Sequence, residues 1–447
     1  MSSSTDAVSS SRRVALRHLE RVERDDAFVG RLSADGVDAR SRRQARELVA
    51  GVTRQRRWLD FVLADAYNGD YDAMEPRLRH ILRLGLYELE FQSTPTRAAV
   101  HEYVELAKQT LRQGAANLVN GVLRAIDRRE DGPQPASGDP AEDLALRHSH
   151  PTWLVRRWLD RFGGDATAEL LRWNNRRPAH HVRVNPIRTT RAEVEAWLDA
   201  NDVVYTRSPH LDTGLRLKRL QPLVQGGLLD DGRVAVQDES AALVVRLLDP
   251  QPDETILDGC AAPGGKTLAI AAAMDGRGQI RAIDSHAGRL SRVEEGAAAH
   301  GVEGLVQTDA ADLRAVADRA DPPQADRVLL DVPCSGLGVL GKRADLRWQR
   351  RPEDLEELAA LQDELLDAAA QLVRPGGLVV YSTCTIAPEE NEHRIDRFLA
   401  RHVDFTVESA EGHVPDEMVS PSGFLATRPH QHRMDGAFAA RLRRVTS

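Results

Sequence analysis

The chain has 447 residues, which at about 150 residues per domain predicts roughly three domains, each long enough to bury a core. Hydrophobic residues make up 41% and charged residues 29%, a globular composition that excludes a fibrous or wholly disordered chain. The net charge of −8 does not by itself mark a nucleic-acid-binding protein, although basic stripes can lie within an acidic total.

No apolar run approaches the ~18 residues that span a bilayer, and the serine-rich start lacks the hydrophobic segment of a secretory signal. We therefore expect a cytoplasmic protein without a membrane partner. The three cysteines, Cys260, Cys334 and Cys384, stand far apart and form no CxxC pair, which argues against a zinc module or a disulfide framework. We expect no metal site. In a reducing compartment, isolated thiols are either buried small apolar residues or reactive groups.

The N-terminal part of the chain has helical periodicity. After an expected flexible tail over residues 1–11, apolar residues recur at i, i+3 and i+4 and predict an all-helical domain over residues 12–129. Proline, glycine and acidic residues then predict a linker over residues 130–143.

A region of mixed character follows over residues 144–225. Residues 150–162 and 191–201 have the apolar spacing of helices, whereas the sequence HHVRVNP over residues 180–186 alternates like a strand. We therefore expect a small α+β domain between the helical domain and the rest of the chain.

From residue 226 to residue 447, short β-rich runs alternate with helical segments, including a long helix expected over residues 353–373. This alternation predicts a parallel sheet with helices on both faces. The expected strands cover residues 254–258, 279–284, 304–309, 326–331 and 378–384, and further extended runs lie near residues 405–407, 423–426 and 437–442.

Polar side chains stand at the carboxyl ends of all five expected parallel strands. They are Asp258, Asp284, Asp309, Asp331 and Cys384. Each residue alone is more often a turn former or a helix cap. Because parallel sheets of this kind bind ligands at the carboxyl ends of their strands, five such residues together predict a site.

The segment DGCAAPGGKT over residues 258–267 predicts a glycine-rich turn whose backbone N–H groups approach a ligand. A phosphate-binding loop requires glycine where Cys260 stands, and the G-x-G-x-x-G of dinucleotide sites is missing. An adenosine-containing cofactor without a phosphate chain fits better, with Asp284 placed to bind the ribose hydroxyls. A nucleotide-phosphate site that uses Asp331 as a magnesium ligand, and a purely structural turn, stay open at this point.

Two of the thiols follow expected strand ends, Cys334 in DVPCSG and Cys384 in YSTCT. Inert buried cysteines are one interpretation. The other is cytosine C5 methylation, in which a thiolate adds to C6 so that C5 can attack a methyl group. A cation such as Lys266 would lower the pKa of the thiol, and Asp331 is placed to hydrogen-bond the base.

Long motifs resemble the Sun/Fmu family of RNA cytosine-5 methyltransferases. They are DGCAAPGGKT, DVPCSGLGVLGKRADLRW at residues 331–348 and STCTIAPEENE at residues 382–392. Further similarity lies at residues 148–158, 174–186, 236–243 and 429–444. The helical segments at residues 86–91, 98–108 and 117–126 resemble the NusB-type RNA-binding domain. A NusB-like domain fused ahead of this methyltransferase is the arrangement of the family's bacterial 16S rRNA branch.

The resemblance implies an α/β Rossmann-like methyltransferase domain that uses S-adenosylmethionine, preceded by an all-α NusB-like domain and a small α+β RNA-binding segment. It implies methyl transfer to C5 of a cytosine in 16S rRNA, cytosine 967 in the family's RNA numbering, through a covalent adduct between cysteine and C6. The expected partner is 16S rRNA or a small-subunit assembly intermediate, and the expected state is a monomer. Alternatives are another rRNA or tRNA cytosine, a P-loop-like NTPase, and a non-catalytic RNA-binding or antitermination-type factor.

The motifs also assign roles by resemblance. Cys384 matches the nucleophile, Cys334 the cysteine that helps to release the product, and Asp331 the acid near the methyl donor and the base. Asp284 matches the ribose-binding acid and Asp309 the residue beside the adenine. The cofactor loop comprises Cys260, Ala261, Ala262, Pro263, Gly264, Gly265 and Lys266. Leu337, Ala344 and Thr385 stand where the family often has Thr, Pro and Ser, and none of them is a reacting group.

Two arginine clusters are candidate RNA contacts because phosphate charge dominates nucleic-acid affinity. For any single arginine, a solvated helix face with ion pairs is the better interpretation. The second cluster lies between the helical and catalytic domains and is favoured as part of the RNA path. The first contains Arg42, Arg43, Arg46, Arg54, Arg56 and Arg57, and the second contains Arg172, Arg176, Arg177, Arg183 and Arg188.

Overall fold

A computed structural model describes residues 9–25 and 36–446, and most of the expected N-terminal tail lies outside these residues. The chain divides into two compact units. The first unit contains Met1–Arg176 and Leu340–Arg350, and the second contains Arg177–Val339 and Arg351–Ser447. The division therefore falls inside the region that was expected to form one small α+β domain.

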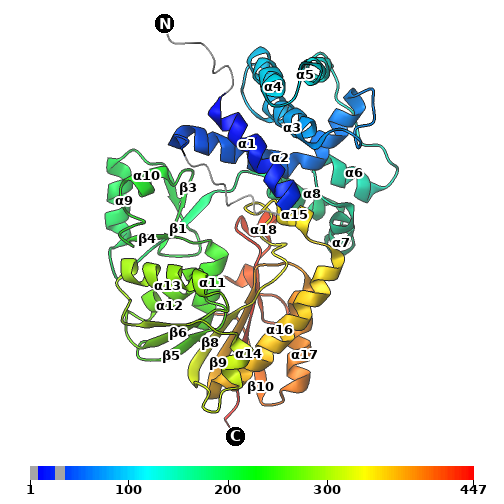
Figure 1. Ribbon diagram of the computed structural model, residues 1–447. Coiled ribbons are helices and arrows are strands. Elements are labelled where there is room, and N and C mark those ends of the chain that lie inside the picture. The colour runs from blue at the N-terminus through cyan, green and yellow to red at the C-terminus, as the bar shows by residue number, and fades with distance from the viewer. Residues whose placement is uncertain (1–8, 26–35, 447) are drawn as a thin grey trace. The chain divides into compact units, whose positions relative to one another are not determined.

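Helices α1 to α5 of the first unit share one apolar core. They are α1 (Ser10–Asp25), α2 (Ala39–Ala66), α3 (Pro76–Phe91), α4 (Thr96–Thr110) and α5 (Gln113–Asp127). Helix α3 contacts the other four, which explains why apolar residues occupy most of its surface (Figure 1). Helix α1 begins two residues before the expected start of the helical domain. The prediction of an all-helical domain is confirmed.

Three shorter helices complete this part of the unit: α6 (Pro140–Arg147), α7 (Thr152–Phe162) and α8 (Gly164–Asn175). Helix α6 takes the last four residues of the expected linker. Its start is explained by Asp139, whose side chain accepts the N–H of Ala141 at 2.9 Å, and by Pro140 at the first helical position.

The segment Leu340–Arg350 comes from the middle of the sequence but groups with the helices of the first unit. Its short helix α15 (Leu346–Gln349) carries Arg347, whose side chain is fully buried. The guanidinium donates to the carbonyl oxygen of Ser149 at 3.0 Å and to Oδ1 of Asn175 at 2.8 Å. Trp348 donates through Nε1 to the carbonyl oxygen of Thr53 at 2.7 Å.

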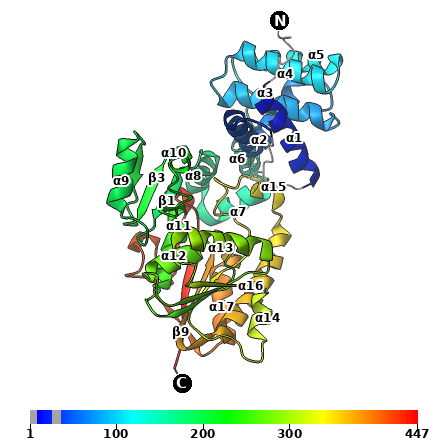
Figure 2. The same cartoon turned by 60° about the vertical axis from the view of Figure 1, so that its left-hand side comes forward.

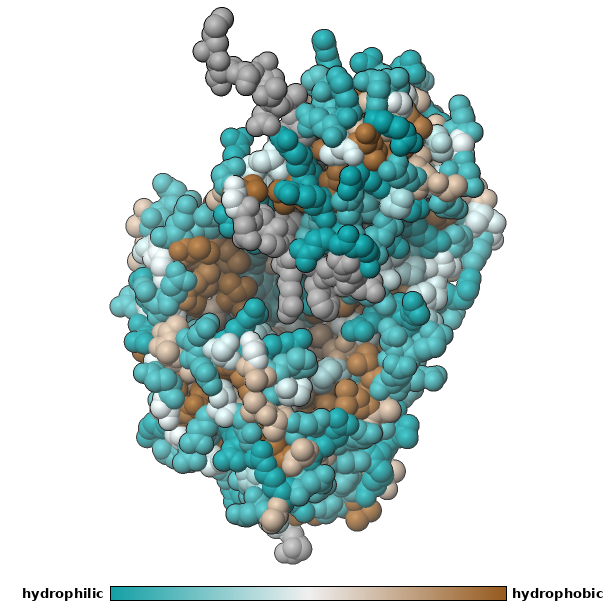
Figure 3. Space-filling view, viewed as in Figure 1, coloured by the Kyte–Doolittle hydropathy of each residue, from teal (hydrophilic) through white to brown (hydrophobic). Residues whose placement is uncertain are grey.

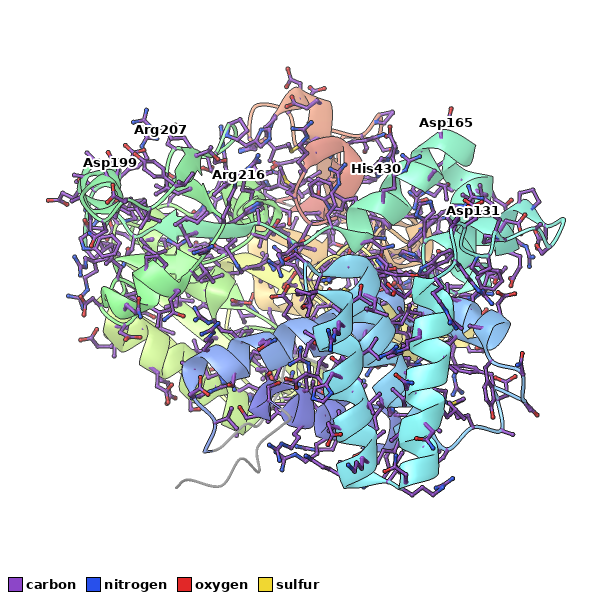
Figure 4. The ribbon with its side chains drawn as sticks, turned by 90° about the horizontal axis from the view of Figure 1, so that it is seen from above. Asp131, Asp165, Asp199, Arg207, Arg216 and His430 are labelled. Carbon is purple, nitrogen blue, oxygen red and sulfur yellow. The ribbon has the colours of Figure 1, made fainter. Side chains whose placement is uncertain are left out.

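The second unit begins with a four-stranded antiparallel sheet in the order β2-β3-β1-β4. Its elements are β1 (His180–Val184), α9 (Arg191–Ala200), β2 (Tyr205–Arg207), β3 (Gly214–Leu217), α10 (Gln221–Gln225) and β4 (Val234–Val236). Arg207 and Arg216 lie on the neighbouring strands β2 and β3 (Figure 4). Strand β4 pairs with β1 although it lies beyond residue 226, so the small sheet extends past the expected boundary. Hydrophobic residues gather over α10 and this sheet (Figure 3).

An eight-stranded sheet forms the rest of the second unit, with the main order β10-β12-β9-β8-β5-β6-β7. Helices cover both of its faces, α12 and α13 on one and α14, α16 and α17 on the other (Figures 1 and 2). Its elements are α11 (Glu239–Leu248), β5 (Thr255–Asp258), α12 (Gly265–Ala273), β6 (Gln279–Ile283), α13 (Ala287–His300), β7 (Val306–Asp309), α14 (Leu313–Ala317), β8 (Ala325–Asp331), α16 (Pro352–Leu372), β9 (Val373–Thr383), η1 (Pro388–Glu390), α17 (Glu392–Arg401), β10 (Phe405–Glu408), η2 (Asp416–Met418), β11 (Leu425–Ala426), α18 (Pro429–His432) and β12 (Phe438–Arg444).

The expected parallel arrangement is correct for β5 to β9. Strand β12, however, runs antiparallel to both β9 and β10. The segment between β10 and β12 contains the short helices η2 and α18 and the strand β11, which also pairs antiparallel with β12. Strands β5 and β8 are parallel neighbours at which the strand order reverses, since β6 and β7 lie on one side and β9 on the other. Ligands bind in the crevice at such a switch point.

A buried ion pair in the first unit provides a test of its packing. Arg12 Nη2 lies 2.7 Å from Glu88 Oε2, and the Tyr103 hydroxyl donates to Glu88 Oε1 at 2.7 Å. We expect Glu88→Ala to lower the free energy of unfolding by about 3 kcal/mol, because it removes the fully buried partner of Arg12 and leaves only the pair with Glu102 at 3.2 Å. Urea denaturation of the full chain measures this. Glu75→Ala, which breaks the exposed pair with Arg112, should cost less than about 1 kcal/mol. Equal losses in the two variants would contradict the prediction.

Candidate active site

The two thiols at the strand ends lie together. Strands β8 and β9 are parallel, with Asp331 opposite Ser382, so the loops that follow them leave the sheet at the same edge. The Sγ atoms of Cys334 and Cys384 are 3.2 Å apart. The backbone N–H of Cys384 also donates to Cys334 Sγ at 3.3 Å. The thiols can therefore exchange a proton or act on one small ligand.

The Cys334 thiol stays protonated. Its hydrogen bond with Cys384 and its burial raise the pKa of the Cys334 thiol well above the usual range. Burial and the nearby carboxylates, first Asp258 and then Asp331, also raise the pKa of Cys260. Of the three cysteines, Cys260 and Cys334 are thus poor thiolates.

An ion pair lies beside the thiols. Lys266 Nζ is 2.6 Å from Asp331 Oδ2, and the Ser382 hydroxyl donates to Asp331 Oδ1 at 2.8 Å. Burial lowers the pKa of Lys266, but the Asp331 carboxylate outweighs it, so the pKa of Lys266 ends above its usual value. Lys266 therefore carries a positive charge in the site. Its direct partner is the Asp331 carboxylate, and Cys384 is close enough to interact with its charge.

Glu390, which was not among the residues predicted from the sequence, joins the loop that follows β8 to the loop that follows β9. Its fully buried carboxylate accepts the backbone N–H of Ser335 at 2.7 Å and the Ser335 hydroxyl. The Ser335 hydroxyl also lies 2.8 Å from Thr385 Oγ1. Gln362 of α16 donates through Nε2 to Glu390 Oε2 at 3.0 Å and to the Pro333 carbonyl oxygen at 2.9 Å. The residues that follow the two thiols, Ser335 and Thr385, are thus joined through the Ser335 hydroxyl, which is held by Glu390.

A second set of hydrogen bonds shapes the loop that follows β9. The Tyr381 hydroxyl donates to the carbonyl oxygen of Glu390 at 2.6 Å. Asn391 accepts the Thr383 hydroxyl at 2.6 Å and donates to the carbonyl oxygen of Thr385 at 3.1 Å. These bonds turn the chain back immediately after Cys384. In the sequence, the acidic and amide residues of the PEENE segment at residues 388–392 are the feature from which these bonds could have been expected.

The glycine-rich loop connects β5 to α12 as predicted. Gly264 has φ +102, and a Cβ there would lie 3.1 Å from the Cα of Val293. A Cβ at Gly265 would meet nothing within 4 Å, so space is open at this point of the loop. The backbone N–H groups of Ala262 and His286 donate to the Asp284 carboxylate at 3.2 and 2.9 Å. The glycine-rich loop and the Asp284 carboxylate are thus hydrogen-bonded to each other.

Two further acids of the crevice have different environments. Asp309 pairs with Arg319 at 2.8 Å, and hydrogen bonds from Arg319 lower the pKa of Asp309. Asp258 is 1% exposed, and burial raises its pKa to about 7. Its Oδ2 accepts the Thr267 hydroxyl at 2.7 Å, while its Oδ1 has no hydrogen-bond partner among the described residues.

The four-stranded sheet is linked to the glycine-rich loop through Gln237. Gln237 donates through Nε2 to the carbonyl oxygen of Gly265 at 3.1 Å and accepts Nε–H of Arg183 at 2.8 Å. Arg183 is buried, because its strand β1 lies inside the sheet. Its assignment as a surface RNA contact is therefore wrong. Arg188, also of the second cluster, is exposed and donates to carbonyl oxygens at the end of α13.

The first arginine cluster is divided between structural and exposed residues. Arg57 pairs with Glu142 at 2.6 Å, and Arg54 donates to the carbonyl oxygen of Gly341 at 3.2 Å. The guanidinium of Arg56 lies 4.6 Å from the ring centre of Trp348. Arg42, Arg43 and Arg46 are exposed.

The described residues contain neither a metal-binding cluster nor a membrane-spanning helix. Within residues 9–25 and 36–446, no group of three or more His, Cys, Asp or Glu residues is arranged to hold a metal ion. In the same part of the chain, no helix combines the length and apolar character of a membrane span.

Family models match three successive parts of the chain. Residues 9–128 match the NusB family, residues 150–223 the ferredoxin-like domain of RsmF/B-like methyltransferases, and residues 245–443 the 16S rRNA methyltransferase RsmB/F model. A relative in Bacillus subtilis, named "Probable ribosomal RNA small subunit methyltransferase B", is 35% identical over 97% of this chain and 98% of its own. The ribosomal RNA small subunit methyltransferase B of Erwinia tasmaniensis is 36% identical over 81% of this chain and 82% of its own.

Solved structures show the same architecture. The crystal structure of PH0851 superposes with a TM-score of 0.80 and 28% identity, covering 97% of this chain and 98% of that one. The crystal structure of NSun6 from Pyrococcus horikoshii with SFG gives a TM-score of 0.58 at 23% identity, covering 65% and 97% of the two chains. At 23% identity, the likeness to NSun6 concerns the fold alone.

Asp258 predicts a pH dependence of stability. A carboxyl whose pKa is about 7 in the fold and 3.8 when unfolded binds more protons in the folded state between these values. Its contribution to stability is therefore complete below about pH 4 and is lost as the pH rises to about 7, by on the order of 4 kcal/mol. Asp258→Asn should remove this slope. Denaturation at several pH values measures it, and parallel curves for wild type and variant would refute the assignment.

Glu390 predicts a loss of thiol proximity. We expect Glu390→Ala to lower the free energy of unfolding by about 3 kcal/mol, because buried donors of Ser335 and Gln362 lose their acceptor. It should also slow disulfide formation between Cys334 and Cys384 under diamide, measured by thiol titration. Glu356→Ala, which changes an exposed residue of α16, is the control. Unchanged oxidation in Glu390→Ala would show that the carboxylate does not hold the thiols together.

Proposed function

Because the chain belongs to the RsmB/F family of 16S rRNA methyltransferases, we propose that it methylates C5 of a cytosine in 16S rRNA, cytosine 967 in that RNA's numbering. The expected Sun/Fmu-type family and the Rossmann-like fold with NusB-like and α+β parts are confirmed. Methylation of small-subunit rRNA is the activity of this family. The observation that carries the finer proposal is the 3.2 Å separation of the Cys334 and Cys384 sulfurs.

The methyl donor of this class is S-adenosylmethionine, which supplies an electrophilic methyl group bound to a sulfonium. The residues of the crevice fit such a donor. Small side chains and the open position at Gly265 leave room beside the loop from Cys260 to Lys266. Asp284 is held by backbone N–H groups at the end of β6, where it can accept hydrogen bonds from ribose hydroxyls. Asp309, at the end of β7, is proposed to lie beside the adenine.

Cys384 is the proposed nucleophile. Because Cys334 stays protonated, its S–H can donate to the Cys384 sulfur and stabilise a thiolate there. The thiolate adds to C6 of the cytosine, and the electron pair of the C5–C6 double bond forms the bond from C5 to the methyl group, while the pair of the broken methyl–sulfonium bond would stay on the donor's sulfur. Transfer of the C5 proton to water then restores the double bond and expels the Cys384 sulfur from C6 as a thiolate.

The remaining groups act on the base and on product release. Asp331, charged and paired with Lys266, is proposed to hydrogen-bond the exocyclic amine as charge develops on the ring. Cys334 is proposed to assist the elimination step, since its sulfur is within hydrogen-bond distance of the Cys384 sulfur. The NTPase alternative has no use for two adjacent thiols, and a non-catalytic factor would not need them.

The two cysteines predict opposite phenotypes. Cys384→Ser should abolish methyl transfer, because a serine hydroxyl is a far weaker nucleophile at neutral pH. Cys334→Ser should form the C6 adduct but release it slowly, so that protein and RNA migrate together on a denaturing gel. The assay is transfer of labelled methyl groups to unmodified 16S rRNA, followed by mapping of the modified base.

The double variant Cys334→Ser, Cys384→Ser is the control and should give neither product nor adduct. Near-full turnover by Cys384→Ser would falsify the assignment of the nucleophile. Mapping of the methyl group to another rRNA position, or transfer only to tRNA, would correct the substrate and leave the reaction class intact.

A further inference from the structure

A basic groove with an aromatic floor lies within the first unit, formed by the second half of α2, the end of α3, the segment before α6, and helices α6 and α8. Its volume is about 630 Å³. Three arginines line it, Arg147, Arg172 and Arg176, together with His148 and the aromatic residues Trp58 and Phe91. The family assignment gives this groove no function.

The arginines of the groove are available to an anion. All three are exposed, and none of them forms an ion pair with a carboxylate in the described part of the chain. The arginine charges also act on His148. Burial, and then the charges of Arg172 and Arg147, lower the pKa of His148 to about 4. The histidine is therefore neutral at pH 7. Unpaired cations at one site are costly unless a negatively charged partner neutralises them.

Negative charge in the groove is small. Glu90 is the acidic residue among those that line it, and its carboxylate accepts Nε1–H of Trp58 at 2.8 Å. Asp131, in the segment before α6, and Asp165, in the first turn of α8, belong to the same unit but are not among the lining residues (Figure 4). Three arginines thus face a single carboxylate that is already hydrogen-bonded.

The aromatic rings give the groove a flat apolar surface. Phe91 is 44% exposed and packs on one side against Tyr87, with ring centres 5.4 Å apart and planes 19° apart. Trp58 is held by its bond to Glu90 and by contact with Phe61, with ring centres 5.9 Å apart. Exposure of a large aromatic face is unfavourable in water, in a chain with only 4% aromatic residues.

We propose that this groove binds an unpaired segment of rRNA, with a base stacked on Phe91 and the flanking phosphates paired with Arg147 and Arg172. The inference rests on the proposed function for the identity of the substrate. Bases of single-stranded RNA stack on aromatic side chains without strict sequence preference, and phosphates pair with arginine. A paired helix cannot present its base faces in this way, so the ligand is a loop, bulge or single-stranded end.

Binding of the full-length protein to naked 16S rRNA at several salt concentrations tests the proposal. Each phosphate contact contributes about 0.7 to 0.9 to the slope of log affinity against log salt. Arg147→Glu combined with Arg172→Glu should weaken binding more than tenfold at low salt and reduce the slope by about 1.5. Phe91→Ala should weaken binding about tenfold and leave the slope unchanged, because a base stack is not ionic.

Arg124→Glu, which changes an exposed residue of α5 outside the groove, is the matched control and should bind as the wild type does. In methyl transfer, the groove variants should raise KM for RNA and leave kcat unchanged, whereas unfolding would reduce kcat. Wild-type affinity and slope in the groove variants would overturn the proposal. A loss seen only with protein-containing subunit particles would also overturn it, because the ligand would then be a protein.

The outcomes separate this inference from the proposed function. If the wild-type protein transfers no methyl group to 16S rRNA, the proposed function fails whatever the groove variants do. If wild type methylates the RNA and the groove variants match it in affinity, KM and salt dependence, only the groove is wrongly assigned.

Discussion

The catalytic geometry depends on one buried carboxylate. Strands β8 and β9 bring two loops to the same edge of the sheet, but parallel pairing ends at Asp331 and Ser382, before either thiol. Beyond that point the loops are joined by Glu390, which accepts both the backbone N–H and the hydroxyl of Ser335 and in addition the amide of Gln362. Burial raises the pKa of Glu390 although these donors act in the opposite direction. A carboxyl group is needed at this buried position because no apolar side chain could accept three hydrogen bonds.

The arrangement of charges explains why three cysteines in one crevice do not behave alike. Burial, and then the charges of Asp258 and Asp331, raise the pKa of the Cys260 thiol, so Cys260 remains a small and unreactive side chain of the loop. The positive charge of Lys266 is balanced by the Asp331 carboxylate, so Lys266 also orients that carboxylate. The protonated Cys334 is then the group that differentiates Cys384 from the other thiols, through a contact that only the folded chain creates.

Sequence patterns predicted the parallel core because short β-rich runs, most clearly those of β5 and β8, alternate with helical segments. They missed β2, β3 and β4, which are three or four residues long and too short to show alternation. The motif residues around Cys334 and Cys384 were predictable because the chemistry requires particular side chains. Glu390, Gln362 and Gln237 were not, because they act on backbone groups or side chains that lie 28 to 55 residues away in sequence. Arg183 shows the reverse error, since composition cannot distinguish a surface arginine from one buried in a central strand.

The placement of Leu340–Arg350 explains why linear domain boundaries fail for this chain. Six residues after Cys334 the chain enters the first unit, where Arg347 is fully buried. Its Nη1 and Nη2 donate to oxygens of Ser149, Asn174 and Asn175, while its Nε has no hydrogen-bond partner among the described residues. Burial lowers the pKa of Arg347 well below its usual range, and these acceptors are neutral, so the cost of burying the charge is only partly offset. A hydrophobic residue could fill the same space but would leave those oxygens without donors. The first unit is thus completed by residues that belong in sequence to the catalytic motif, and neither part is a self-contained stretch of chain.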